Sequence, residues 1–134
     1  MADSIELEVA TPERELVREQ VADVQVPGKD GYLGILPGHA PLLGVLGTGA
    51  LSYAVGPRRH FIAIHGGFLE VLPEHVRVLA NQAEAAEDID LDRARADLAR
   101  AQQEVAAVAV AGDPDEALDH LALAQARVAA AEQK

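Results

Sequence analysis

The residues that could carry chemistry in this 134-residue chain are five histidines and two serines, since cysteine is absent. The histidines are His39, His60, His65, His75 and His120. A metal site needs ligands that cluster in space, yet no two histidines are closer than five positions. Ser4 and Ser52 lie outside any Gly-x-Ser-x-Gly elbow, and no Gly-x-x-x-x-Gly-Lys phosphate loop occurs. The sequence therefore predicts neither catalytic residues nor a metal site.

The chain is acidic throughout, which narrows its possible partners. Its formal net charge is −11. Residues 1–84 carry 11 acidic and 6 basic side chains, and residues 85–134 carry 11 acidic and 5 basic ones. A nucleic-acid partner requires clustered Lys and Arg, which this balance argues against. We expect no disulfide framework, no signal peptide and no membrane span, because cysteines and long apolar runs are missing.

Residues 1–84 have the pattern of a β domain. Ile5, Leu7 and Val9 alternate with polar residues, as in a strand with one buried face. Gly47 and Gly49 bracket an expected turn, and Gly66-Gly67 predicts a two-residue hairpin because both positions can take positive φ. We expect further strands at 16–18, 21–26, 50–55, 59–64, 68–72 and 76–80. Nine or ten short strands in roughly 80 residues predict a β-sandwich or flattened barrel.

Residues 85–134 predict a second domain, an antiparallel two-helix hairpin. Asp90 is the predicted N-cap of the first helix, Gly112 its C-terminal stop, and Asp113-Pro114 the start of the second. Apolar residues recur every three or four positions along both helices, namely Leu91, Ala94, Leu98, Ala101, Val105 and Val108, then Ala117, Leu121, Ala124, Val128 and Ala131. Because these stripes are rich in alanine, we expect a marginal hairpin that depends on the sandwich or on a partner.

An uncharged segment, residues 31–43, stands apart from both patterns. It contains three glycines, two prolines and one histidine, so it has too many helix breakers for a helix and too little polarity for an ordinary loop. Pro37 and Pro41 fix φ, and Gly38 allows conformations closed to other residues. We expect a rigid loop between strands, with His39 at its tip, that is either buried or presented to a partner.

Charged residues at the start of the first helix allow two interpretations. Asp90 and Arg93 are three positions apart and share a helix face, and Arg127 can approach them if the hairpin folds back. An acid that accepts from an amine, with two guanidiniums that pair with phosphate, could hold a nucleotide. The alternative is a capping Asp, an ion pair within the helix and a solvent-exposed Arg, which the residue types alone favour.

Several segments of the chain resemble the epsilon subunit of bacterial F-type ATP synthases. Residues 33–43, Leu-Gly-Ile-Leu-Pro-Gly-His-Ala-Pro-Leu-Leu, match a long ungapped motif of that family. Residues 66–71 match its Gly-Gly-Phe-x-Glu-Val segment, residues 76–84 its last strand and linker, and residues 89–94 its Ile/Leu-Asp-x-x-Arg-Ala motif. The resemblance spans nearly the whole chain and implies a ten-stranded β-sandwich followed by a C-terminal helical hairpin.

The resemblance implies a non-catalytic rotor subunit of the central stalk, which couples proton translocation to ATP synthesis. Its implied partners are the gamma subunit and the membrane-embedded c-ring, at the cytoplasmic face of the cell membrane. In relatives the hairpin can extend toward the catalytic alpha/beta hexamer and inhibit ATP hydrolysis. Tyr32 stands where many relatives carry a carboxylate. The implied contacts with gamma and the c-ring are Gly31, Tyr32, Leu33, Gly34, Leu36, Pro37, Gly38, His39, Ala40, Pro41 and Leu42.

The resemblance also implies a regulatory ATP site, with no cofactor required, since some relatives bind ATP between sandwich and hairpin. Glu84, Asp90, Arg93 and Arg127 fall on the motif positions of that site. Leu123 stands where some ATP-binding relatives carry another arginine, and this weakens phosphate pairing. The alternative function is a free-standing nucleotide-sensing module that needs no gamma subunit. The apolar loop favours the rotor subunit, because a free-standing protein rarely exposes such a patch.

Overall fold

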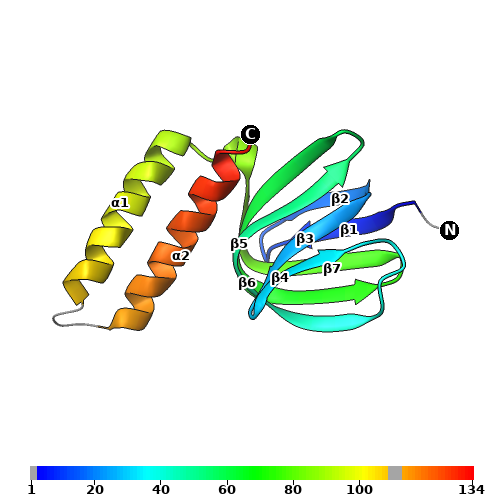
Figure 1. Ribbon diagram of the computed structural model, residues 1–134, viewed down its shortest axis with the longest axis horizontal. Helices are drawn as coiled ribbons and strands as arrows, with labels where there is room; N and C mark the ends of the chain where they lie inside the picture. Colours follow the sequence, from blue (N-terminus) through cyan, green and yellow to red (C-terminus); the bar gives the residue numbers. More distant parts are fainter. Residues whose placement is uncertain (1–2, 109–112) are drawn as a thin grey trace.

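The computed structural model describes residues 3–108 and 113–134, in which a β domain packs against a pair of helices (Figure 1). These residues form seven strands, then a 3-10 turn and two α-helices. The strands are β1 (Ile5–Ala10), β2 (Glu15–Val21), β3 (Asp23–Gly28), β4 (Gly31–Ile35), β5 (Leu42–Val55), β6 (Arg58–Leu72) and β7 (His75–Ala85). The 3-10 turn (Ala86–Asp88) leads to α1 (Leu91–Val108) and α2 (Pro114–Ala131). A β domain followed by a helical hairpin is the order that the sequence predicted.

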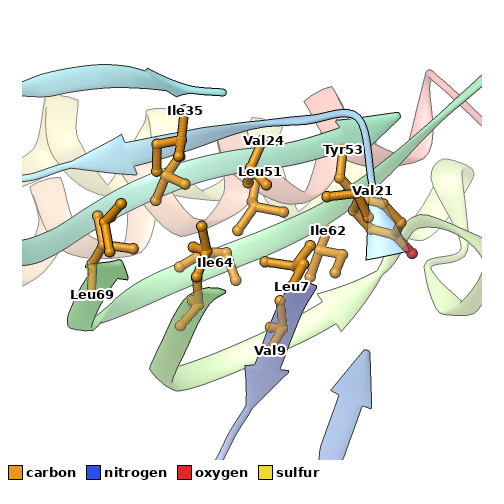
Figure 2. Packing of buried hydrophobic residues seen from close by; sticks show 14 of the residues in the cluster. Leu7, Val9, Val21, Val24, Ile35, Leu51, Tyr53, Ile62, Ile64 and Leu69 are labelled. Carbon is orange, nitrogen blue, oxygen red and sulfur yellow. The ribbon is translucent and has the colours of Figure 1, made fainter. Parts of the chain in front are cut away.

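The strands form one hydrogen-bonded sheet that folds over on itself into a sandwich. Their order is β2-β1-β7-β6-β5-β3-β4, with β1 and β7 parallel. Although β1 and β3 are separated by three strands in this order, Leu7 and Val24 belong to the same buried cluster (Figure 2). The sheet must therefore close around that cluster. Its members are mainly Ile, Leu and Val at alternate strand positions, as the period-two pattern predicted.

Two long strands replace the several short ones expected between residues 42 and 72. β5 and β6 pair in one unchanged register along their whole length. The expected turn at Gly47 and Gly49 is wrong, and so is the expected hairpin at Gly66-Gly67. Gly66 and Gly67 do take positive φ, of 67° and 125°, but β6 bends there and continues. Long bent strands explain why the same sandwich architecture contains seven strands in the described residues rather than ten.

The two helices form a hairpin in which α2 lies between α1 and the sheet (Figure 1). Asp90 caps α1, since its Oδ1 accepts from Arg93 N at 3.1 Å. Asp113 caps α2 by accepting from Asp115 N at 2.9 Å, and Pro114 is the first helical residue. Both helix starts confirm the prediction. The predicted stop at Gly112 lies outside the described residues.

Helix α2 is buried on two sides, which the single predicted stripe did not indicate. The predicted stripes of the two helices are buried or half-buried. Another side of α2, which includes Ala126 and Ala130, packs on β5 and β6 near Ala63. Ile89 is the largest fully buried side chain of this second cluster. The hairpin therefore docks mainly through alanine, which buries little area per residue.

Candidate functional site

Residues 31–42 begin as an edge strand and continue as a surface loop. β4 closes one end of the sheet and pairs with β3. Ile35 points into the core, whereas Tyr32 and Leu36 are 62% and 64% exposed. The other predicted contact residues are exposed or half-buried: Gly31, Leu33, Gly34, Pro37, Gly38, His39, Ala40, Pro41 and Leu42. The structure thus presents this segment at the surface, one of the two outcomes that the sequence left open.

Backbone hydrogen bonds hold the loop in shape. Gly38 N donates to Pro73 O at 2.8 Å, which ties the loop to the turn between β6 and β7. His39 N donates to Leu36 O at 3.1 Å, and the His39 Nδ1 lies 2.7 Å from Ala40 O. Gly38 has a φ of 85°, a conformation that side chains disfavour. The loop backbone that carries the apolar side chains is therefore held in one conformation. Less conformational entropy is then lost when a partner binds.

A second exposed apolar surface lies next to this loop and was not predicted. Val45, Phe68 and Leu79 are direct cross-strand neighbours on β5, β6 and β7. Their exposed fractions are 51%, 65% and 48%, and Leu43, two residues before Val45, is 79% exposed. We call these four residues the apolar face. Leu69 belongs to the core, so its strand neighbour Phe68 points outward.

The loop and the apolar face form one continuous surface. A depression of 580 Å³ is lined by Tyr32, Leu33 and Leu42 from the loop segment and by Leu43 and Val45 from the apolar face, with Lys29 and Asp30 also in its lining. Contiguous exposed apolar surface of this kind marks sites of interaction with a protein or a membrane. This surface is therefore the candidate partner interface of the molecule.

The four residues of the implied nucleotide site are only partly brought together. Arg127 Nε donates to Glu84 Oε1 at 2.8 Å. Arg127 also pairs with Asp97, which the sequence had not singled out, at 3.2 Å between Nη1 and Oδ2. Asp90 is used as the cap of α1, and Arg93 is exposed. The structure therefore joins Glu84 to Arg127 and gives Asp90 a structural role.

A cavity beside this ion pair shows what a nucleotide would meet. Its volume is 460 Å³, and it is lined by Ala63, Gln82, Ala83, Glu84, Leu123 and Arg127. Arg127 is the basic residue of this lining, and two carboxylates already accept from it. A phosphate would have to compete with these carboxylates for the guanidinium, and Leu123 offers it no donor. The regulatory ATP site that the resemblance implies therefore stays a prediction.

The titratable side chains and the helices of residues 3–108 and 113–134 bear on two other kinds of site, a metal centre and a membrane span. Within these residues, no group of three or more His, Asp or Glu side chains could hold a metal ion. Neither described helix is both long and apolar enough to cross a membrane. Burial in the sandwich raises the pKa of the Tyr53 phenol, whose ring stacks on His60 with centroids 5.1 Å apart. That perturbed group lies in the core, apart from the partner surface.

Comparison with known proteins agrees with the fold. Residues 4–86 match the family model described as the ATP synthase delta/epsilon chain, beta-sandwich domain. The ATP synthase epsilon chain of Solibacter usitatus is 61% identical over 134 residues, all of both chains. That of Koribacter versatilis is 47% identical over 103 residues, which is 77% of this chain and 72% of its own. A chain in the structure of the Euglena gracilis mitochondrial ATP synthase, OSCP/F1/c-ring, superposes with a TM-score of 0.82 at 25% identity, covering 97% of this chain and 82% of that one.

The chain belongs to the ATP synthase epsilon chain family. Its similarity to the Solibacter protein extends through the hairpin as well as the sandwich, so the assignment covers both parts. The resemblance that residues 33–43, 66–71 and 89–94 indicated is confirmed. The chain is accordingly an accessory subunit of an ATP synthase and not the subunit that carries out catalysis.

Proposed function

We propose that this chain is the rotor subunit that joins the gamma subunit to the c-ring, at the cytoplasmic face of the cell membrane. The apolar face binds gamma, and the loop of residues 36–41 reaches the c-ring. The family supports an ATP synthase role, and the structural relative comes from an assembly that contains F1 and the c-ring. The single observation that carries the proposal is the continuous apolar surface. Backbone hydrogen bonds hold its loop in shape, and the residues of the apolar face are 48–79% exposed.

The hairpin has a regulatory role in this proposal. When it leaves the sandwich it reaches the catalytic alpha/beta hexamer and slows ATP hydrolysis. Its mainly alanine contact with β5 and β6 supports such movement, because weakly packed elements open first. No cofactor is needed for the coupling role, since protein contacts alone carry it.

The proposal is tested by placing a charge in the centre of the apolar face. Phe68→Glu puts a carboxylate between Val45 and Leu79, where it must be desolvated when a partner covers it. We expect its affinity for the purified gamma subunit to fall by roughly a hundredfold, as for other buried interface anchors. The matched control is Gln25→Glu, which adds the same charge at an exposed position on β3. Its affinity should change by less than about twofold.

Binding is measured by calorimetry with gamma and by reassembly with the c-ring complex stripped of this subunit. Equal affinities for Phe68→Glu and the unmodified chain would refute the apolar face as the gamma contact. If the unmodified chain bound neither gamma nor the stripped complex, the rotor assignment itself would fail. A free-standing nucleotide sensor would then become the better account.

A further inference from the structure

The guanidinium of Arg127 connects three elements of the fold. Arg127 lies on α2, and its Nε donates to Glu84 on β7 at 2.8 Å. Its Nη1 donates to Asp97 on α1 at 3.2 Å. The exposed fractions are 24% for the Arg127 side chain, 36% for Glu84 and 25% for Asp97, so solvent screens these contacts only in part. We call these three residues the Arg127 clamp.

The clamp acts where apolar packing is weak. The hairpin docks on the sandwich largely through alanine, so each polar contact across that boundary matters more. Another charged contact across it joins His65 Nε2 to Asp119 Oδ2 at 3.2 Å, but it is ionic only when the imidazole is protonated. The Lys134 ammonium donates to the Ile89 carbonyl at the other end of α2. Of these three contacts, Arg127–Glu84 is the one that joins a guanidinium to a carboxylate, and the same guanidinium also reaches Asp97 on α1.

We propose that the Arg127 clamp holds the hairpin against the sandwich in the absence of nucleotide. Its two carboxylates, Glu84 and Asp97, accept hydrogen bonds from the guanidinium that would bind a phosphate according to the family resemblance. Leu123 lines the adjoining cavity and adds no second donor. The docked state of this chain is therefore set by its own side chains, and a phosphate of ATP would have to compete with two carboxylates for Arg127. The consequence for ATP hydrolysis rests on the proposed function, whereas the docking itself does not.

The test measures the distance between hairpin and sandwich in the isolated chain. The chain has no cysteine, so Gln25→Cys on β3 and Gln125→Cys on α2, both at exposed positions, allow two spin labels to be attached. Arg127→Met removes the guanidinium and keeps most of the side-chain stem. We expect the population with a lengthened or broadened distance to rise roughly tenfold, the effect of losing hydrogen bonds to charged groups.

Arg100→Met is the matched control. Arg100 also pairs with Asp97, but both residues lie on α1, so that contact does not join the hairpin to the sandwich. Its distance distribution should match that of the unmodified chain. Glu84→Gln is the second test variant, since it loosens the clamp without touching either helix. Far-ultraviolet circular dichroism confirms that each variant keeps its strands and helices.

Two results would overturn the proposal. One is an unchanged distance distribution in both Arg127→Met and Glu84→Gln. The other is a narrowing of the distribution when millimolar ATP is added to the unmodified chain, with loss of that response in Arg127→Met. The proposal expects ATP to leave the distribution unchanged. Because neither gamma nor the c-ring takes part, failure here is distinct from failure of the rotor assignment, which the gamma-binding measurement decides.

Discussion

At the scale of single residues, Gly67 determines the course of β6. Its φ of 125° is rarely adopted by residues with a side chain. A Cβ at this position would collide with the Leu79 carbonyl oxygen and lie 2.8 Å from the Ala80 Cα. β7 therefore passes so close to β6 at this point that residue 67 has room for the hydrogen atom of glycine but not for a Cβ. The close approach of β6 and β7 at this point therefore depends on glycine at position 67.

We predict that Gly67→Ala destabilises the sandwich by about 3 kcal/mol or more, because both the backbone conformation and the contact with β7 become unfavourable. The measurement is the free energy of unfolding in urea. Gly34→Ala is the control, since a Cβ there meets nothing within 4 Å and the position is exposed. Its stability should stay within about 0.5 kcal/mol of the unmodified chain. Similar losses in both variants would show that the contact at Gly67 has no special role.

Gly66-Gly67 also shows where sequence reasoning reaches its limit. The pair was predicted to take positive φ, and it does. Positive φ is compatible with a hairpin and equally with a bend in a continuing strand. The choice depends on partners far along the chain, since β6 pairs with β5 on one side and β7 on the other. Local residue types carry no information about those partners, so the strand boundaries were wrong while the sandwich was right.

At the scale of elements, the helices were more predictable than the strands. Caps and stripes are local features, and Asp90 and Asp113 lie at the helix starts as predicted. The second buried side of α2 was missed because alanine is compatible with buried and exposed positions alike. In the candidate sites, Glu84 and Arg127 do meet, but their partner Asp97 and the apolar face depend on packing between distant segments.

We predict that Asp113→Ala weakens the hairpin by about 1 kcal/mol, because the amide of Asp115 loses its acceptor at the start of α2. Asp113→Asn removes the same charge but keeps an oxygen that can cap, so it should retain most of the stability. Hydrogen exchange of the α2 amides distinguishes the two variants from each other and from the unmodified chain. Equal loss in both would mean that the charge matters and the cap does not.

At the scale of the whole molecule, the chain has two cores of unequal strength. The sandwich core contains residues from all seven strands and none from the helices among the residues described. The second cluster joins the hairpin to Ala63 and Ala86 and is rich in alanine. The sandwich should therefore fold without the hairpin. The apolar face should persist as well, because its residues lie on strands β5, β6 and β7 of the sandwich. Partner binding and regulation are thus physically separable.

This separation predicts how three forms of the chain act on the cognate catalytic complex stripped of this subunit. The unmodified chain, a version ending at Ala86 and Arg127→Met should all bind the complex, because all three keep the apolar face. The truncated form should leave ATP hydrolysis at the rate of the stripped complex, since it has no hairpin. Arg127→Met should inhibit about threefold more than the unmodified chain, because its hairpin leaves the sandwich more often.

The measurement is the steady-state rate of ATP hydrolysis, with binding determined in parallel so that affinity and inhibition are not confused. Arg100→Met serves again as the control and should inhibit like the unmodified chain, because its ion pair lies within α1. Equal inhibition by the truncated and full chains would place the inhibitory contact in the sandwich and exclude the hairpin. Weaker inhibition by Arg127→Met than by the unmodified chain would mean that the docked hairpin is the inhibitory form. The order of the three rates therefore decides which state of the hairpin acts on the catalytic subunits.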